Sequence, residues 1–231
     1  MLRIITDFDG PIIDVSPRYY RVYQICLEKH RRPQQQIKKL SLDQFWLQKR
    51  QHIPEIEIGI ASGLDEIQAK AFAKLRKEIV HTHPYFQLDT LKPGVIDTLL
   101  KIQKAGFDLA VMTMRRHSEL EYALETHNLG KFFPENRRFC LSDDYVKTRD
   151  VEDKPLLMRN SLSTLPTAQD TWMIGDTEAD IAAAKKHNIK VIGIECGIRD
   201  RNQLEMYSPD FIVQDFNQAV DFIISKHHKV L

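Results

Sequence analysis

From residue 85 onward, short apolar runs alternate with longer segments in which apolar residues recur at helical spacing. The apolar runs predict buried strands, at residues 107–112, 139–141, 171–174, 190–194 and 211–213. The segments between and around them predict helices, at residues 93–104, 118–127, 154–165, 179–187 and 217–226. Strands that alternate with helices are typical of a parallel sheet covered by helices on both faces. This part of the chain is therefore predicted to form an α/β structure.

Residues 15–84 have a different pattern, with no convincing strand. They predict consecutive helices, at residues 16–31, from 42, from 54 to 63, and at 64–80. Ser16 is expected to cap the first of these helices, and Ser41 with Gln44 has the form of a capping box for the second. Because one more apolar run, residues 2–6, precedes this block, the helices are predicted to be an insertion. We expect a Rossmann-like α/β core of residues 1–14 and 85–231 and an α-helical cap of residues 15–84.

The last helix of the insertion is predicted to be amphipathic. Its apolar positions recur every four residues, at Ile67, Ala71, Leu75 and Ile79. Basic residues occupy other positions along the same helix, and Arg76 is one of them. The pattern therefore predicts a buried apolar stripe and a solvated basic side that includes Arg76.

Composition and charge indicate which functional classes to expect. The 231 residues are 42% hydrophobic and 28% charged, as in ordinary soluble globular proteins. Lys and Arg number 33 against 32 Asp and Glu, so the net charge of +1 gives no reason to expect nucleic acid or a membrane surface as a partner. We find neither a membrane-length apolar run nor a secretion signal, and a cytoplasmic protein is the expectation. The three cysteines are widely spaced, which argues against a disulfide framework and a structural zinc site.

Acidic side chains follow two of the predicted strands. Asp7 and Asp9 come directly after residues 2–6, and Gly175-Asp176 with Asp180 comes after residues 171–174. Side chains two apart on a strand project to the same side, and carboxyl ends of parallel strands form the ligand-binding edge of such sheets. Carboxylates gathered there would repel each other unless a cation is bound. The pattern therefore indicates either a metal site or an acid beside a nucleophile.

With these residues the sequence resembles the haloacid dehalogenase (HAD) superfamily, in particular its phosphoglycolate phosphatase-like members with a helical cap. The resemblance covers essentially the whole chain. It rests on four motifs in order, namely Asp7-Phe8-Asp9, Thr113 in AVMTM, Lys154 in DKPLL, and Gly175, Asp176 and Asp180 in GDTEAD. Pro11 departs from the pattern, because the family usually has Thr or Val after D-x-D-G.

The resemblance implies a Mg²⁺-dependent phosphatase that works through an aspartyl-phosphate. Asp7 would be the nucleophile, and Asp9 would protonate the leaving oxygen and later activate water. Mg²⁺ would lie between Asp7, the backbone carbonyl of Asp9 and Asp176, with Asp180 supporting that arrangement. Thr113 and Lys154 would bind the phosphate oxygens.

Substrate choice is the open question in this reading. Candidate contacts to an anionic part of the substrate are Arg18, Tyr19, Arg50, Arg115 and Arg116. They favour a small phosphorylated metabolite, with a phosphoglycolate-like acid first and a sugar phosphate second. Two alternatives stay open: a phosphomutase of the same superfamily, and a non-catalytic member that binds a phosphate ligand in a regulatory role. The enzyme is expected to be a monomer or a homodimer.

Overall fold

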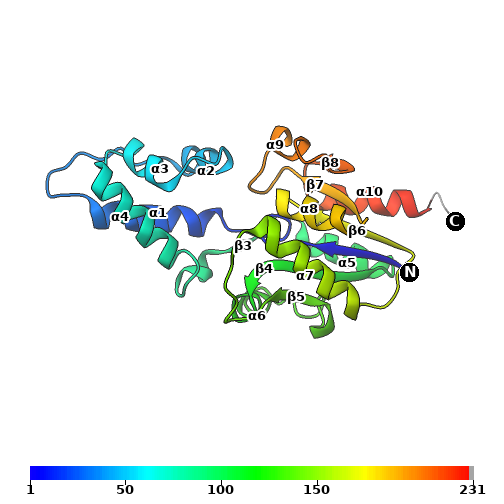
Figure 1. The fold of residues 1–231 in the computed structure, drawn as a ribbon. Coiled ribbons are helices and arrows are strands. Elements are labelled where there is room, and N and C mark those ends of the chain that lie inside the picture. The colour runs from blue at the N-terminus through cyan, green and yellow to red at the C-terminus, as the bar shows by residue number, and fades with distance from the viewer. Residues whose placement is uncertain (229–231) are drawn as a thin grey trace. The chain divides into compact units, whose positions relative to one another are not determined.

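The computed structural model describes residues 1–228 and divides into two compact units (Figure 1). The core unit comprises Met1–Ile13 and the chain from Leu91 onward, and the helical unit is Asp14–Thr90. Residues 85–90 thus group with the helices. The chain passes between the units twice, in β2 (Ile13–Asp14) and β3 (Thr90–Leu91), and these two short strands pair with each other.

The core unit is built on a six-stranded parallel sheet with the order β5-β4-β1-β6-β7-β8. Its strands are β1 (Leu2–Thr6), β4 (Asp108–Arg116), β5 (Arg138–Leu141), β6 (Asp170–Gly175), β7 (Lys190–Ile194) and β8 (Phe211–Val213). Every strand predicted from an apolar run is present. The first strand lies in the middle of the sheet, between β4 and β6, so the residues after it are surrounded by other strand ends.

Helices cover both faces of this sheet. Those of the core unit are α5 (Val95–Lys104), α6 (His117–Thr126), α7 (Asp150–Thr164), α8 (Glu178–Lys186), α9 (Arg201–Glu205) and α10 (Phe216–His228). Ile5 and Met173 pack in one cluster with residues of α7 and α8. The alternate residues Ile4 and Ile174 are fully buried too, and α5 and α10 pack on each other and on β4 and β7. Burial on both faces is what the continuous apolar runs require, and the predicted α/β fold is confirmed.

The helical unit contains four α-helices around its own apolar core. They are α1 (Ser16–His30), α2 (Leu42–Arg50), α3 (Glu55–Ala61) and α4 (Glu66–Ile79), followed by a 3₁₀ turn, η1 (Tyr85–Leu88). Tyr23 lies at the centre of the core, stacked on Phe45 with ring centroids 4.8 Å apart and edge-on to Phe72. The capping box of Ser41 and Gln44 is present as predicted.

Two local predictions for this unit are wrong. Ser16 does not cap α1 but is its first residue, and the side chain of Asp14 accepts a hydrogen bond from the Ser16 N–H at 2.9 Å. In α4 the buried face runs through Gln68, Phe72 and Arg76, while Ile67 is 78% exposed. Gln68 is buried because its side chain completes a capping box and donates to the His30 carbonyl. Arg76 is buried because it forms an ion pair with Glu55 at 2.6 Å.

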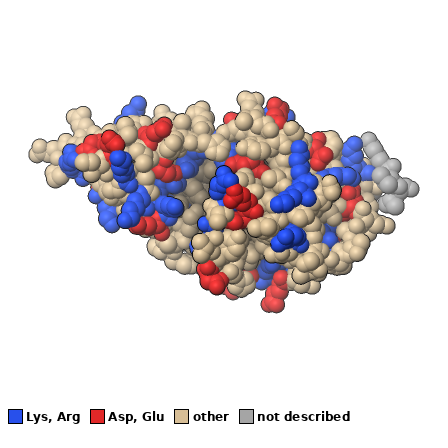
Figure 2. All heavy atoms as spheres, in the orientation of Figure 1, with Lys and Arg blue, Asp and Glu red and all other residues tan. Residues whose placement is uncertain are grey.

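Basic and acidic side chains are interspersed over the face in Figure 2, as the near-zero net charge suggests. Within residues 1–228, no helix combines the length and the apolar character that crossing a membrane would need.

Candidate active site

Three aspartates of the core unit meet at the carboxyl edge of the sheet. Asp7 directly follows β1, Asp176 directly follows β6, and Asp180 lies in the first turn of α8. Because β1 and β6 are adjacent parallel strands, their ends coincide, and the Asp7 N–H donates to the Ile174 carbonyl at 2.8 Å. One carboxylate oxygen from each aspartate lies within 4.8 Å of the others, and all three residues are buried. The structure thus joins two of the predicted acidic strand ends in one cluster.

Lys154 is buried in this cluster. Its Nζ lies 2.8 Å from Oδ2 of Asp7 and 2.5 Å from Oδ1 of Asp180, and the residue is 1% exposed. The sequence placed it at the start of a helix, whereas α7 begins one turn earlier, at Asp150. That extra turn is secured by Asp153, whose side chain accepts hydrogen bonds from Thr148 and Tyr145. Lys154 therefore approaches the acids from a fixed helix.

The charges of this cluster perturb each other strongly. Burial raises the pKa of Asp7 well above its ordinary value, and the Asp180 carboxylate adds to this, although Lys154 works in the opposite direction. Burial, followed by Asp180, raises the pKa of Asp176 to about 7. Burial alone would lower the pKa of Lys154, but the charges of Asp180 and Asp7 raise it above its ordinary value. Lys154 contacts two of the three carboxyl groups, so when all three are ionised the cluster has an excess of negative charge that a cation would neutralise.

Asp176 is held in place by the segment that follows β7. The Ile198 N–H donates to its Oδ2 at 2.6 Å. A Cβ at Gly197 would lie 1.9 Å from the same oxygen, and a Cβ at Gly10, where φ is +91°, would lie 2.4 Å from Cγ. Only glycine allows the backbone to approach this carboxylate so closely at both positions. The sequence analysis missed this clamp; the only available signal was a Gly just after a predicted strand.

The cluster fits a hard divalent cation. Oδ1 of Asp176 is buried and has no hydrogen-bond partner within residues 1–228, which is costly unless the oxygen binds something else. Carboxylate oxygens are the ligands that Mg²⁺ prefers, and the ionised forms of Asp7 and Asp176, whose pKa values are raised, would gain from its charge. Asp7 and Asp176, with Asp180 beside them, are the residues that could hold such an ion.

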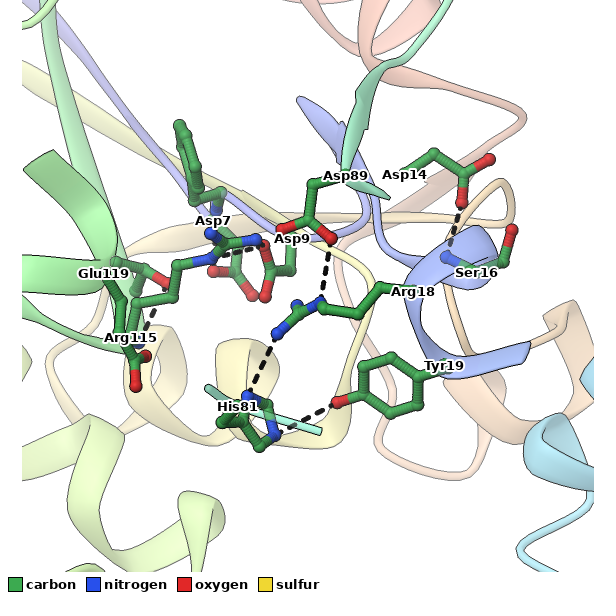
Figure 3. Close-up of polar contacts among 12 residues, drawn as sticks. Asp7, Asp9, Asp14, Ser16, Arg18, Tyr19, His81, Asp89, Arg115 and Glu119 are labelled. Atoms are coloured by element: carbon green, nitrogen blue, oxygen red, sulfur yellow. Dashed lines mark hydrogen bonds and ion pairs between the residues drawn. The ribbon is translucent and has the colours of Figure 1, made fainter. Parts of the chain in front are cut away.

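Asp9 lies near the same edge with Arg115 (Figure 3), and Thr113 contacts the backbone of Arg115. Nε and Nη2 of Arg115 contact Oδ1 of Asp9 at 2.9 and 2.7 Å. Thr113 is 2% exposed. It lies within β4, which continues to Arg116, whereas the sequence predicted that this strand ends at residue 112. Its Oγ1 accepts a hydrogen bond from the Arg115 N–H at 3.2 Å.

Pro11 is compatible with the loop that carries Asp9. The bonds that close this loop come from the N–H groups of Gly10, Ile12 and Ile13, which donate to Ile13 or Phe8 carbonyls at 2.9 to 3.1 Å. The loop closes through these three N–H groups while position 11 is occupied by proline, which has no N–H to donate.

The other candidate substrate contacts have different surroundings. Arg18 is fully buried in the helical unit, where Nε pairs with Asp89 at 2.8 Å and Nη1 contacts the Val80 carbonyl and His81 (Figure 3). Tyr19 contacts His81 through its hydroxyl at 3.4 Å. Arg50 ends α2, and Arg116 donates to the Tyr145 carbonyl at 3.4 Å. Arg18 thus helps to hold its own unit together.

The sequence of this protein matches a family model over most of its length. The match covers residues 4–194, and the family is described as haloacid dehalogenase-like hydrolase. The chain belongs to this family. The recognition made from the four motifs is confirmed, and with it the prediction that the protein is a hydrolytic enzyme of the phosphatase kind.

Proteins similar to this HAD-like chain at low sequence identity are named as phosphatases. A phosphoglycolate phosphatase from Pseudomonas putida is 22% identical over 218 residues, 92% of this chain and 76% of that protein. Pyrophosphatase PpaX from Oceanobacillus iheyensis is 23% identical over 161 residues, 69% and 72% of the two chains. A crystal structure of a candidate phosphatase from Clostridium difficile superimposes with a TM-score of 0.73 at 19% identity. The superposition covers 96% of this chain and 97% of that chain. At that identity the structural likeness establishes the fold.

The raised pKa of Asp176 predicts that the effect of Mg²⁺ on stability depends on pH. Because the folded-state pKa of about 7 exceeds the ordinary value of 3.8, the protonated acid favours the folded state, and that contribution is lost as pH rises from about 4 to 7. Asp7 acts in the same direction. Mg²⁺ should therefore raise the melting temperature more at pH 8 than at pH 5.5, as measured by calorimetry after EDTA treatment. Equal shifts at both pH values would contradict the assignment of these acids to a cation.

Proposed function

We propose that this protein is a Mg²⁺-dependent phosphomonoester hydrolase that acts through a phosphoryl group on Asp7. The observation that carries the proposal is the buried cluster of Asp7, Asp176 and Asp180 around Lys154 at the carboxyl edge of the sheet. It combines a nucleophile, a place for a cation and a fixed positive charge in one site.

The proposed reaction has two steps. A carboxylate oxygen of Asp7 attacks phosphorus, the ester P–O bond breaks, and Asp9 gives its proton to the departing oxygen. Asp9 then takes a proton from water, the water oxygen attacks phosphorus, and the bond to Asp7 breaks to release inorganic phosphate. When bound by Asp7, the Asp9 carbonyl and Asp176, Mg²⁺ would neutralise phosphate charge that otherwise repels the nucleophile.

Thr113 and Lys154 are proposed to bind the phosphate oxygens. The Thr113 hydroxyl accepts the Arg115 N–H and so has its own proton to donate. Lys154 already contacts Asp7, so a phosphoryl group bonded to Asp7 comes within its reach. We also propose that the helical unit serves as the cap domain that the family resemblance implies.

For the substrate we propose a small phosphorylated metabolite, with phosphoglycolate-like acids first. The names of the curated relatives support this class, since they include phosphoglycolate phosphatases and a pyrophosphatase. The test is a panel of phosphate esters that includes phosphoglycolate, sugar phosphates and pyrophosphate, with Mg²⁺ and with excess EDTA. Hydrolysis only with Mg²⁺ supports the proposal, a requirement for a bisphosphate activator indicates a phosphomutase, and ligand binding without turnover indicates a regulatory member.

Replacing Asp176 with Asn should weaken Mg²⁺ binding by about 10- to 100-fold or more, because a neutral amide replaces a carboxylate ligand. The amide oxygen can still accept the Ile198 N–H, so the fold should persist. The Mg²⁺ concentration for half-maximal activity and Mg²⁺ calorimetry on the purified variant measure the change. Asp170→Asn is the matched control, because Asp170 lies at the opposite end of β6 and pairs with Lys190. Unchanged Mg²⁺ affinity in Asp176→Asn would refute the ligand role.

A further inference from the structure

Arg115 and Asp9 form an ion pair with an unusual arrangement. Both Nε and Nη2 of Arg115 contact a single oxygen of Asp9, Oδ1, at 2.9 and 2.7 Å. The Arg115 side chain is 3% exposed and the Asp9 side chain 31%. The arginine is therefore the fixed partner and the aspartate the accessible one.

The position of Arg115 follows from the sheet. Strand β4 extends beyond the end of its neighbour β1, and its register with β5 shifts between Met112 and Arg116. Arg115 lies in this irregular segment, and its contacts with Asp9 place its guanidinium against the loop that follows β1. The guanidinium is also supported by the Phe8 ring, whose centroid lies 5.3 Å from its central carbon.

We propose that Arg115 is a positioning residue, which anchors the Asp9 carboxylate in the orientation required for proton transfer in both steps of the reaction. This inference rests on the proposed function and adds a residue to it. Its proposed effect on the reaction is exerted through the Asp9 carboxylate, which Nε and Nη2 of its guanidinium contact.

The physical reason is that proton transfer depends steeply on geometry. Asp9 lies in a loop, and its side chain is partly exposed, so rotation about its side-chain bonds is restrained mainly by what it contacts. Two donors on one oxygen restrain the position of that oxygen and thereby limit rotation of the carboxylate. A misplacement of about 1 Å can reduce a catalysed rate about 10²-fold. Arginine is suited to this task because its guanidinium stays charged and presents its donors in a rigid plane.

The sequence alone suggested another role for Arg115, contact with an anionic part of the substrate. The two roles predict different kinetics. A substrate contact mainly affects KM, and only for substrates that carry the second anionic group. A residue that positions Asp9 mainly affects kcat, for all substrates whose leaving oxygen needs a proton.

The test compares Arg115→Met and Arg115→Lys with the wild type on an alkyl phosphate and on nitrophenyl phosphate. Arg138→Met is the matched control, because Arg138 also forms a largely buried ion pair, with Glu121, on the adjacent strand β5. We would measure steady-state kinetics and single-turnover phosphorylation of Asp7, and determine crystal structures of the variants.

In Arg115→Met we expect kcat for the alkyl ester to fall by about 30- to 100-fold with KM within about 3-fold, while nitrophenyl phosphate still phosphorylates Asp7 at nearly the wild-type rate. Lysine can restore one contact to Oδ1 and should recover most of the loss. The crystal structures should show the Asp9 carboxylate reoriented in Arg115→Met and retained in Arg115→Lys.

A rise in KM with unchanged kcat, or an Asp9 carboxylate that keeps its orientation without the arginine, would overturn the inference and leave the proposed function standing. A wild-type protein that hydrolyses no ester in the panel would overturn the proposed function, and the catalytic role of Arg115 with it. Equal kinetic losses in Arg115→Met and Arg138→Met would show that the loss comes from general destabilisation of the fold, and would also overturn the inference.

Discussion

Asp7→Asn is expected to abolish formation of the phosphoenzyme with every substrate and to lower hydrolysis by about 10⁴-fold or more, as loss of a covalent nucleophile does in other hydrolases. An amide cannot replace the attacking carboxylate, whatever the leaving group is. The fold should tolerate the change, because the amide oxygen can still accept the Phe8 N–H that Asp7 accepts at 2.7 Å.

The measurement is intact-protein mass after brief mixing with nitrophenyl phosphate and an acid quench. The wild type and the Asp170→Asn control should show a phosphate adduct that hydroxylamine removes. The same adduct in Asp7→Asn would show that another residue is the nucleophile.

Asp9→Asn should separate alkyl from aryl esters. General acid–base help is worth about 10²- to 10⁴-fold in rate, and an alkyl phosphate should lose much of that in the first step. Nitrophenolate leaves as a stable anion, so nitrophenyl phosphate should still phosphorylate Asp7. Water attack would then lack its base, and the phosphoenzyme should accumulate.

Rapid quench and mass measurement of the Asp9→Asn variant distinguish these outcomes. Accumulation of the adduct with the aryl ester, together with slow phosphorylation by the alkyl ester, fits the assigned role. If the substitution slows phosphorylation of Asp7 by the same factor with both esters, Asp9 is not the general acid. Asp14→Asn offers a comparison, because Asp14 lies in the same N-terminal stretch and accepts the Ser16 N–H.

Much of the core could be predicted because its signals are local. Apolar runs of Val, Ile and Leu mark strands that are buried on both faces, and Asp7 and Asp176 each come directly after such a run. Adjacent parallel strands then bring the two acids together without further information. Lys154 could be placed only through the family motif, since the first turn of α7 depends on contacts from Thr148 and Tyr145.

What the sequence could not supply are contacts between segments that are distant along the chain. The pairing of Arg115 with Asp9 joins segments 106 residues apart, and the Ile198 N–H reaches Asp176 from the segment that follows β7. In α4 the same limit produced an error. Arg76 was expected in solvent, but Glu55 of α3 draws it into the interior, so a distant charge overrides the local apolar spacing.

Gly10 and Gly197, which pack against Asp176, also limit how this enzyme could be made more thermostable. Replacing glycine by alanine reduces the conformational freedom of the unfolded chain and commonly stabilises proteins by about 0.4 to 1 kcal/mol where the native backbone permits it. At Gly10 and Gly197 the added methyl group would collide with the Asp176 carboxylate. The chain must therefore keep glycine, the residue with the greatest conformational freedom when unfolded, at two positions packed against a buried acid, and gains in heat resistance have to be sought away from this edge of the sheet.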